Sequence, residues 1–201
     1  METAITVVIA LALGAVPTAY LFGRALRGVD VRRSGSGNVG ALNAYRQMGK
    51  PAGLAVLVLD ASKGAAAILI GQRLGAPDLA LYTAAVAATL GHNFSPFLRF
   101  RGGKGAAVVL GISAIMLWEI TAITVVVGAV LFAVTRHALW SMSGVLLVLN
   151  VLTIATQQPI GQIGLCLVLS LVVAGTHLMR QRPQILPALR RRQWRRIMTI
   201  E

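Results

Sequence analysis

Long apolar blocks dominate the chain, and its polar residues are gathered between them. Seven such blocks occur, at residues 3–23, 53–71, 78–97, 105–117, 120–135, 138–155 and 161–178. A helix advances about 1.5 Å per residue, so about 20 apolar residues cross the hydrocarbon core of a bilayer. The blocks show no alternation of polar and apolar positions, so they favour helices over the strands of a barrel. The pattern predicts an all-α integral membrane protein with a single polytopic domain over residues 1–201.

The basic residues decide between six and seven spans. Block 105–117 is short and ends at Trp118 and Glu119, so it can be counted alone or fused with block 120–135. With seven spans, 17 of the 19 Lys and Arg residues fall on one side of the membrane. Cytoplasmic loops carry the excess of Lys and Arg. We therefore expect seven spans, an external N-terminus, a cytoplasmic C-terminus, and cytoplasmic loops over about 24–52 and 91–105.

Composition narrows the class of protein further. Only 12% of residues are charged, against about 25% in soluble domains. The net charge of +13 suits a nucleic-acid binder, but basic clusters beside apolar blocks are typical of membrane proteins, so we expect no nucleic-acid partner. Cys166 stands alone inside an apolar block, and the sequence predicts neither a disulfide nor a metal site. The first block lacks a preceding basic region and a cleavage site, so we expect it to remain as a span.

The C-terminal segment, about 179–201, interleaves arginines with apolar residues such as Leu186, Trp194 and Ile197. It lies either on the membrane surface as a basic amphipathic segment or in the cytoplasm as a disordered tail. The sequence leaves both alternatives open.

The first polar loop has a composition that suits phosphate. Residues 34–46 read SGSGNVGALNAYR. Glycines allow positive φ angles and close approach of a ligand, and successive backbone N–H groups then form an anion site. A flexible Gly/Ser linker is the alternative, although two Asn residues followed by Arg are unusual in a linker. The candidate phosphate-binding residues here are Ser34, Gly35, Ser36, Gly37, Asn38, Gly40, Asn43 and Arg46.

The second polar loop, residues 91–105, ends in Gly-Gly-Lys-Gly at the start of the next apolar block. The N–H groups of a helix N-terminus favour an anion, and Lys104 would neutralise it. This is not a Walker A loop, because no Ser or Thr follows the Lys. The phenylalanines of the loop are expected to anchor it in the membrane interface. Its candidate binding residues are Arg101, Gly102, Gly103, Lys104 and Gly105.

Two histidines and one charged pair complete the candidate chemistry. His92 and His177 can act as general bases or phosphate ligands, or can be hydrogen-bonded structural residues. Asp60 and Lys63 are three residues apart and share one helix face. Charges inside a membrane helix are costly, so these two either pair with each other or take part in the site.

These loops resemble the motifs of the bacterial acyl-phosphate:glycerol-3-phosphate acyltransferase family, PlsY. The family motifs look like SGSGNxGATNxxR and GHxF followed by FxxFKGGKG, and the two matching segments cover 28 of 201 residues. Residues 60–64, DASKG, are also similar to a family DxxKG element. The resemblance implies transfer of an acyl group from acyl phosphate to glycerol 3-phosphate, giving lysophosphatidic acid and phosphate for phospholipid synthesis.

The resemblance also implies a multi-pass protein of the bacterial inner membrane whose active site faces the cytoplasm. It implies no cofactor, no metal and no acyl-enzyme. The residues expected to be catalytic are His92, His177 and Lys104. Monomer and homo-oligomer both stay open.

The chain departs from the family pattern at three places. Leu42 replaces a Thr, and Arg101 replaces a Lys. The third motif resembles HxxNIxR followed by GxE, but here only His177 matches, and the Asn and the Glu of the motif have no counterparts. These departures keep three alternatives open: a different acyl acceptor, a membrane transporter of an organic phosphate, and an inactive relative of the enzyme.

Overall fold

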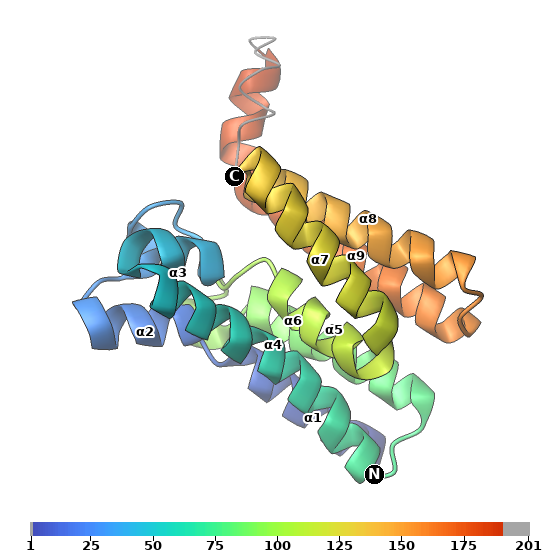
Figure 1. Ribbon diagram of the computed structural model, residues 1–201. Coiled ribbons are helices and arrows are strands. Elements are labelled where there is room, and N and C mark those ends of the chain that lie inside the picture. The colour runs from blue at the N-terminus through green and yellow to red at the C-terminus, as the bar shows by residue number, and fades with distance from the viewer. Residues whose placement is uncertain (1, 191–201) are drawn as a thin grey trace.

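The computed structural model describes residues 2–190, which form a bundle of helices with no strand among them (Figure 1). The all-α prediction is confirmed. The elements are α1 (Glu2–Ala15), α2 (Thr18–Arg27), the 3-10 turn η1 (Val31–Arg33), α3 (Ala41–Met48), α4 (Lys50–Arg73), α5 (Asp78–Asn93), η2 (Pro96–Leu98), α6 (Ala106–Met116), α7 (Trp118–Thr135), α8 (Ala138–Ala155) and α9 (Ile160–Arg190). In Figure 1, α7, α8 and α9 lie together beside a group made of α1, α4, α5 and α6.

Five helical segments are long and apolar enough to cross a membrane. They are Glu2–Arg27, Lys50–Arg73, Trp118–Thr135, Ala138–Ala155 and Ile160–Pro187. Helices α5 and α6 are shorter, with 16 and 11 residues, so the count of seven spans stays a prediction. The blocks at 105–117 and 120–135 are separate helices, because Leu117 leaves the helical conformation at φ −145°.

The first predicted block, 3–23, lies within the candidate span Glu2–Arg27, but it consists of two helices. It is interrupted between α1 and α2 at Pro17, which has no N–H to donate to the preceding turn. Helix α2 then continues to Arg27 and ends at Gly28 in the left-handed conformation, with φ 65°. Hydropathy alone placed the end of this helix four residues too early, because the last turn of α2 is helical but consists partly of basic residues.

Two later boundaries also differ from the prediction. Helix α5 ends at Asn93 rather than at residue 97, because the chain turns before Pro96 into η2. Helix α9 does not end at residue 178 but continues to Arg190, with Pro183 and Pro187 inside it. Residues 179–190 of the predicted tail are therefore helical, and the remainder of that segment, 191–201, lies outside the described residues.

Glycines let the central helices approach each other at backbone distance. A Cβ at Gly111 of α6 would strike the carbonyl oxygen of Ala61 in α4, and a Cβ at Gly64 of α4 would strike that of Val108 in α6. Close approach through small residues is the usual way in which membrane helices pack. The same reciprocal arrangement joins α1 to α5, through Gly14 against Ala88 and Gly91 against Leu11.

Replacement of Gly111 by Ala should destabilise the protein, because the new methyl group meets fixed backbone of α4. We expect a loss of about 1–3 kcal/mol, typical of overpacking, and a drop of about 2–4 °C in Tm for each kcal/mol. Thermal unfolding in detergent measures it. Gly164→Ala is the matched control: Gly164 has open space around its Cβ position, so there the better helix propensity of Ala should leave Tm unchanged or raise it. Equal shifts for both variants would contradict the packing argument.

Candidate active site

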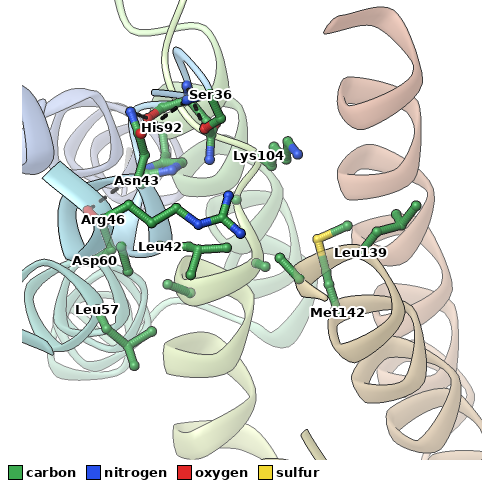
Figure 2. A pocket seen from close by; sticks show the side chains of 17 residues that line it. Ser36, Leu42, Asn43, Arg46, Leu57, Asp60, His92, Lys104, Leu139 and Met142 are labelled. Carbon is green, nitrogen blue, oxygen red and sulfur yellow. Dashed lines mark hydrogen bonds and ion pairs between the residues drawn. The ribbon is translucent and has the colours of Figure 1, made fainter. Parts of the chain in front are cut away.

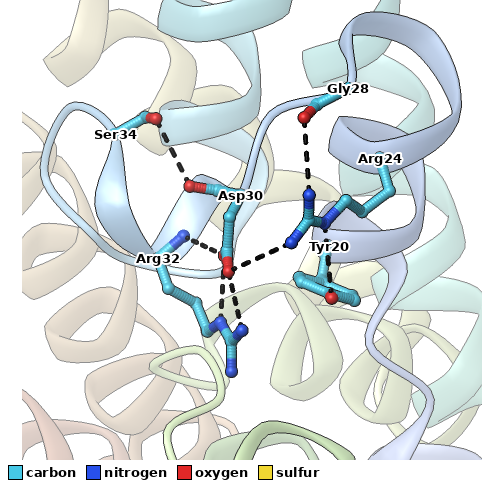
Figure 3. Close-up of polar contacts among 6 residues, drawn as sticks. All are labelled: Tyr20, Arg24, Gly28, Asp30, Arg32 and Ser34. Carbon is cyan, nitrogen blue, oxygen red and sulfur yellow. Dashed lines mark hydrogen bonds and ion pairs between the residues drawn. The ribbon is translucent and has the colours of Figure 1, made fainter.

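Asp30 clamps the beginning of the first polar loop (Figure 3). Its carboxylate accepts hydrogen bonds from the Arg32 side chain at 2.9 and 2.7 Å and from the Arg32 backbone N–H at 3.0 Å. Arg24 lies 3.8 Å away, and the guanidinium groups of Arg24 and Arg32 both lie over the ring of Tyr20. The hydrogen bond from Arg32 lowers the pKa of Asp30 to about 2. The clamp is therefore ionised at neutral pH.

Asn43 holds the rest of this loop. Its side-chain N–H group donates to the carbonyl oxygens of Val31, Ser34 and Asn38 at 2.9–3.1 Å. Its side-chain oxygen accepts from the backbone N–H of Ser36 at 3.2 Å. Asn43 is only 1% exposed. One buried amide thus fixes the shape of the glycine-rich segment, and the alternative of a flexible linker does not describe it.

The glycines of the two loops serve different purposes. Gly35 and Gly37 have φ angles of 62° and 69°, a region that other residues adopt only with strain. Gly102 and Gly103 are instead placed by close contact. Their backbone N–H groups donate to the carbonyl oxygens at the end of α5, both at 3.1 Å, and a Cβ on either would collide with His92. The second loop is therefore pressed directly onto the end of α5.

A cavity of about 180 Å³ lies where three helices begin (Figure 2). The first residues of α3, α6 and α8 all line it. Each helix N-terminus carries unpaired N–H groups and about half a positive charge, so three of them together favour an anion. The lining residues at these helix starts are Gly40, Ala41, Leu42, Gly105, Ala106, Ala107, Ala138 and Leu139.

Charged and polar side chains complete the wall of this cavity. Arg46 on α3 and Lys104 before α6 both line it (Figure 2), as does Asp60 of α4. Ser36 and Asn38 contribute from the first loop. The Oδ1 atom of Asn38 is buried with no hydrogen-bond partner among the described residues.

Beneath the cavity, a buried network joins α4 to α5 and to the break between α1 and α2. The Lys63 ammonium donates to Asp60 at 2.7 Å, to the Val16 carbonyl at 2.8 Å and to the Thr18 hydroxyl at 3.0 Å. Thr18 in turn donates to Asp60. The pair expected from the i, i+3 spacing is thus formed, and His92 Nδ1 lies 3.4 Å from Lys63 Nζ and 3.7 Å from Asp60.

An apolar groove adjoins the cavity between α3 and α4. It has a volume of about 630 Å³ and shares Ala41, Leu42 and Leu57 with the cavity wall. Leu54 and Leu57 are 62% and 39% exposed. The groove therefore connects the polar cavity to a surface suited to lipid chains.

The structure divides the residues expected from the sequence into two sets. The first set lines the cavity: Ser36, Asn38, Gly40, Asn43, Arg46, Asp60, His92, Lys104 and Gly105. The second set does not: Ser34, Gly35, Gly37, Lys63, Arg101, Gly102, Gly103 and His177. His177 is buried on α9, and its Nδ1 atom has no hydrogen-bond partner among the described residues.

The chain is similar to known proteins of one family. Residues 4–189 match the family model described as glycerol-3-phosphate acyltransferase. The chain belongs to the glycerol-3-phosphate acyltransferase family. The resemblance inferred from the two loop motifs is thereby confirmed.

Individual relatives of the acyltransferase family match at moderate identity. A glycerol-3-phosphate acyltransferase of Thermus thermophilus is 36% identical over 178 residues, 86% of each protein. One of Synechococcus sp. is 39% identical over 165 residues, 82% of each. One of Moorella thermoacetica is 52% identical over 107 residues, where the aligned part spans 53% of this chain and 55% of the relative. The chain thus spans about half the length of some curated relatives that it matches.

Crystal structures of PlsY, an integral membrane acyltransferase of this family, have the same fold. The glycerol 3-phosphate form matches with a TM-score of 0.83 at 27% identity, covering 96% of this chain and 94% of that one. The lysophosphatidic acid form matches with a TM-score of 0.81. These similarities establish the chain as an integral membrane protein of the acyltransferase family.

Sequence reasoning missed three parts of the site. The α8 residues Leu139 and Met142 line the cavity but carry no chemical signal in the sequence. Thr18 carries one, because a Pro-Thr pair inside an apolar block marks a break with an exposed backbone. Asp30 was also detectable, as the lone acidic residue within a strongly basic loop.

Acid should weaken the loop clamp. The folded pKa of Asp30, about 2, lies below the ordinary value of 3.8, so the clamp contributes stability above about pH 4 and loses it as the pH falls toward 2. We expect Asp30→Asn to raise the rate of proteolytic cleavage within residues 28–40 at neutral pH. We also expect the difference between variant and native protein to shrink as the pH approaches 2, measured on detergent-solubilised protein with a neutral protease at pH 7 and an acid protease near pH 2. A difference that persists at pH 2 would contradict the assignment.

Proposed function

We propose that this protein transfers an acyl group from acyl phosphate to glycerol 3-phosphate, releasing lysophosphatidic acid and phosphate. The observation that carries the proposal is the convergence of three helix N-termini, Arg46 and Lys104 on one cavity that opens into an apolar groove. Both substrates carry phosphate and one carries a fatty chain, so the reaction needs a polar and an apolar site side by side. The family membership supports acyl transfer to glycerol 3-phosphate.

The cavity is suited to neutralise phosphate without a metal ion. The first residues of α3 and α6 line it together with Arg46 and Lys104, and so do Ser36 and Asn38. Guanidinium and ammonium groups form strong charge-assisted hydrogen bonds with phosphate oxygens. Acyl phosphate is already activated, so catalysis requires mainly alignment of the reactants and stabilisation of developing negative charge.

The groove between α3 and α4 is the proposed place for the acyl chain. Leu42 and Leu57 belong to both the groove and the cavity, so a chain lying in the groove would present its carbonyl carbon to the cavity. The glycerol hydroxyl oxygen then bonds to that carbon, and the bond from the carbon to the phosphate oxygen breaks. The hydroxyl proton ends on the released phosphate, which balances the reaction.

His92 is proposed to donate a hydrogen bond from Nε2 rather than to act as a base. A positively charged ammonium lies 3.4 Å from its Nδ1, which disfavours a proton on that nitrogen and makes it an acceptor. In a neutral imidazole the proton then sits on Nε2. His177 is buried on α9 and does not line the cavity, so its part in proton removal stays a prediction from the sequence alone.

The orientation in the membrane is proposed from charge and arrangement together. We infer seven spans, with the motif loops and the C-terminus on the cytoplasmic side of the bacterial inner membrane. The start of α1 and the end of α9 lie at opposite ends of the bundle (Figure 1), as an odd number of spans requires. The two motif loops lie together at one end of it, which supports a single polar face on the side where Lys and Arg accumulate.

Purified protein supplied with palmitoyl phosphate and glycerol 3-phosphate should release phosphate and lysophosphatidic acid in equal amounts. Lys104→Ala should lower kcat/KM by roughly 100-fold or more, the usual effect of removing one charge-stabilising group. Arg73→Ala, at the far end of α4, is the matched control and should keep full activity. Phosphate without lysophosphatidic acid would mean a different acceptor. Neither product from folded protein would refute the enzyme assignment and favour transport or an inactive relative.

Replacements of His92 separate a hydrogen-bond donor from a base. In His92→Gln the side-chain N–H group can replace Nε2–H, and the amide oxygen can accept from Lys63, so we expect kcat/KM to stay within about tenfold of the native value. His92→Ala should lose roughly 100-fold or more. Equal losses in the two variants, at unchanged thermal stability, would instead identify His92 as the base.

A further inference from the structure

A second, larger cavity lies beside the motif loops and shares no lining residue with the first. Its volume is about 710 Å³, and it is formed by the first loop, the second loop and α9. Two motif residues expected in the substrate site, Gly37 and Arg101, lie here instead. The complete lining is Arg32, Arg33, Gly37, Phe97, Leu98, Arg99, Arg101 and Arg180. We call this set the arginine cavity.

Positive charge in the arginine cavity is largely unbalanced. Of its five arginines, only Arg32 forms an ion pair with a carboxylate within residues 2–190. Arg180 is half-buried and donates to the backbone oxygen of Asn93 at 2.6 Å, and its Nε atom is buried with no hydrogen-bond partner in that part of the chain. Guanidinium groups brought together repel one another. An anion with several oxygen acceptors would remove this repulsion and satisfy the Nε atom.

The rim of the arginine cavity is aromatic and strained. Phe97 and the neighbouring Phe100 are 70% and 64% exposed, whereas Leu98 between them is 1% exposed and anchors the segment. Arg99 and Phe100 have positive φ angles of 53° and 60°, which are unfavourable for residues other than Gly. Exposed aromatic rings collect at the level of the lipid headgroups. The segment therefore presents arginines and aromatic rings together at the membrane surface.

We propose that the arginine cavity binds the phosphate of an anionic phospholipid headgroup. Arginine binds phosphate oxygens in bidentate fashion, and basic pockets between membrane helices are suited to anionic headgroups. The exposed phenylalanines favour a lipid over soluble phosphate, because a lipid brings acyl chains for the rings to contact. The proposal does not depend on acyl transfer, since the two cavities have separate walls.

Lipid retention tests the proposal without using enzyme activity. The protein would be placed in nanodiscs of phosphatidylcholine and phosphatidylglycerol in equal amounts, and the lipids that remain bound after release into detergent would be counted by native mass spectrometry. We expect native protein to retain phosphatidylglycerol in preference to phosphatidylcholine. The double variant Arg33→Gln, Arg99→Gln should lower that retention by roughly tenfold or more. Arg73→Gln, which replaces another exposed arginine at the far end of α4, should not change it.

Three results would overturn the proposal. The first is unchanged phosphatidylglycerol retention in the double variant. The second is an equal loss with Arg73→Gln, which would show that net charge alone attracts the lipid. The third is binding of inorganic phosphate, measured calorimetrically in detergent and abolished in the double variant, without retention of phosphatidylglycerol, which would assign the cavity to a soluble anion. Thermal unfolding of all variants verifies that each is folded. Loss of acyl transfer would leave these results unaffected.

Discussion

The buried pair of Asp60 and Lys63 is the interaction that connects the segments on which the site is built. Two charges in a membrane helix cost several kcal/mol unless every donor and acceptor is satisfied. Here satisfaction requires the Val16 carbonyl and the Thr18 hydroxyl, and Val16 offers its oxygen only because Pro17 interrupts the first span. The break at Pro17 thus supplies the partners that the buried ion pair needs, and His92 lies beside that pair.

Above this network, the N-termini of the helices that begin at the cavity add positive electrostatic potential to that of the cationic side chains. The glycines at 102 and 103 bring the second loop onto the end of α5, and this places the start of α6 at the same cavity as the start of α3. Backbone N–H groups are fixed in position by the helices that follow them, so they need no reorganisation when an anion binds. The close packing of α4 against α6 through glycines fixes the relative positions of the cavity walls that these helices support.

Much of the fold could be predicted from hydropathy, and the site from its two glycine-rich loops. The helix ends were less predictable. Helix α2 continues into polar sequence as far as Arg27, and residues 179–190 of α9 are also helical, because a helix persists where its packing and caps support it and not only where the composition is apolar. Likewise Gly37 and Arg101 belong to motifs but face the arginine cavity, since neighbouring residues of a loop can point to opposite sides. The contribution of α8 to the cavity could not be predicted from the sequence, because aliphatic side chains that line a cavity have the same sequence pattern as those that face lipid.

Both cavities would bind phosphate through positively charged groups, but they differ in whether the bound molecule must leave quickly. In the smaller one, phosphate would meet backbone N–H groups and two long cationic side chains, and the proposed product must leave after every turnover, so tighter ground-state binding would slow the enzyme. The arginine cavity has five guanidinium groups and no such requirement. Its Arg180 reaches the carbonyl of Asn93, the residue after His92, so an anion held there would also stabilise the end of α5. A lipid bound beside the site would then help to keep His92 in place without touching the reacting atoms.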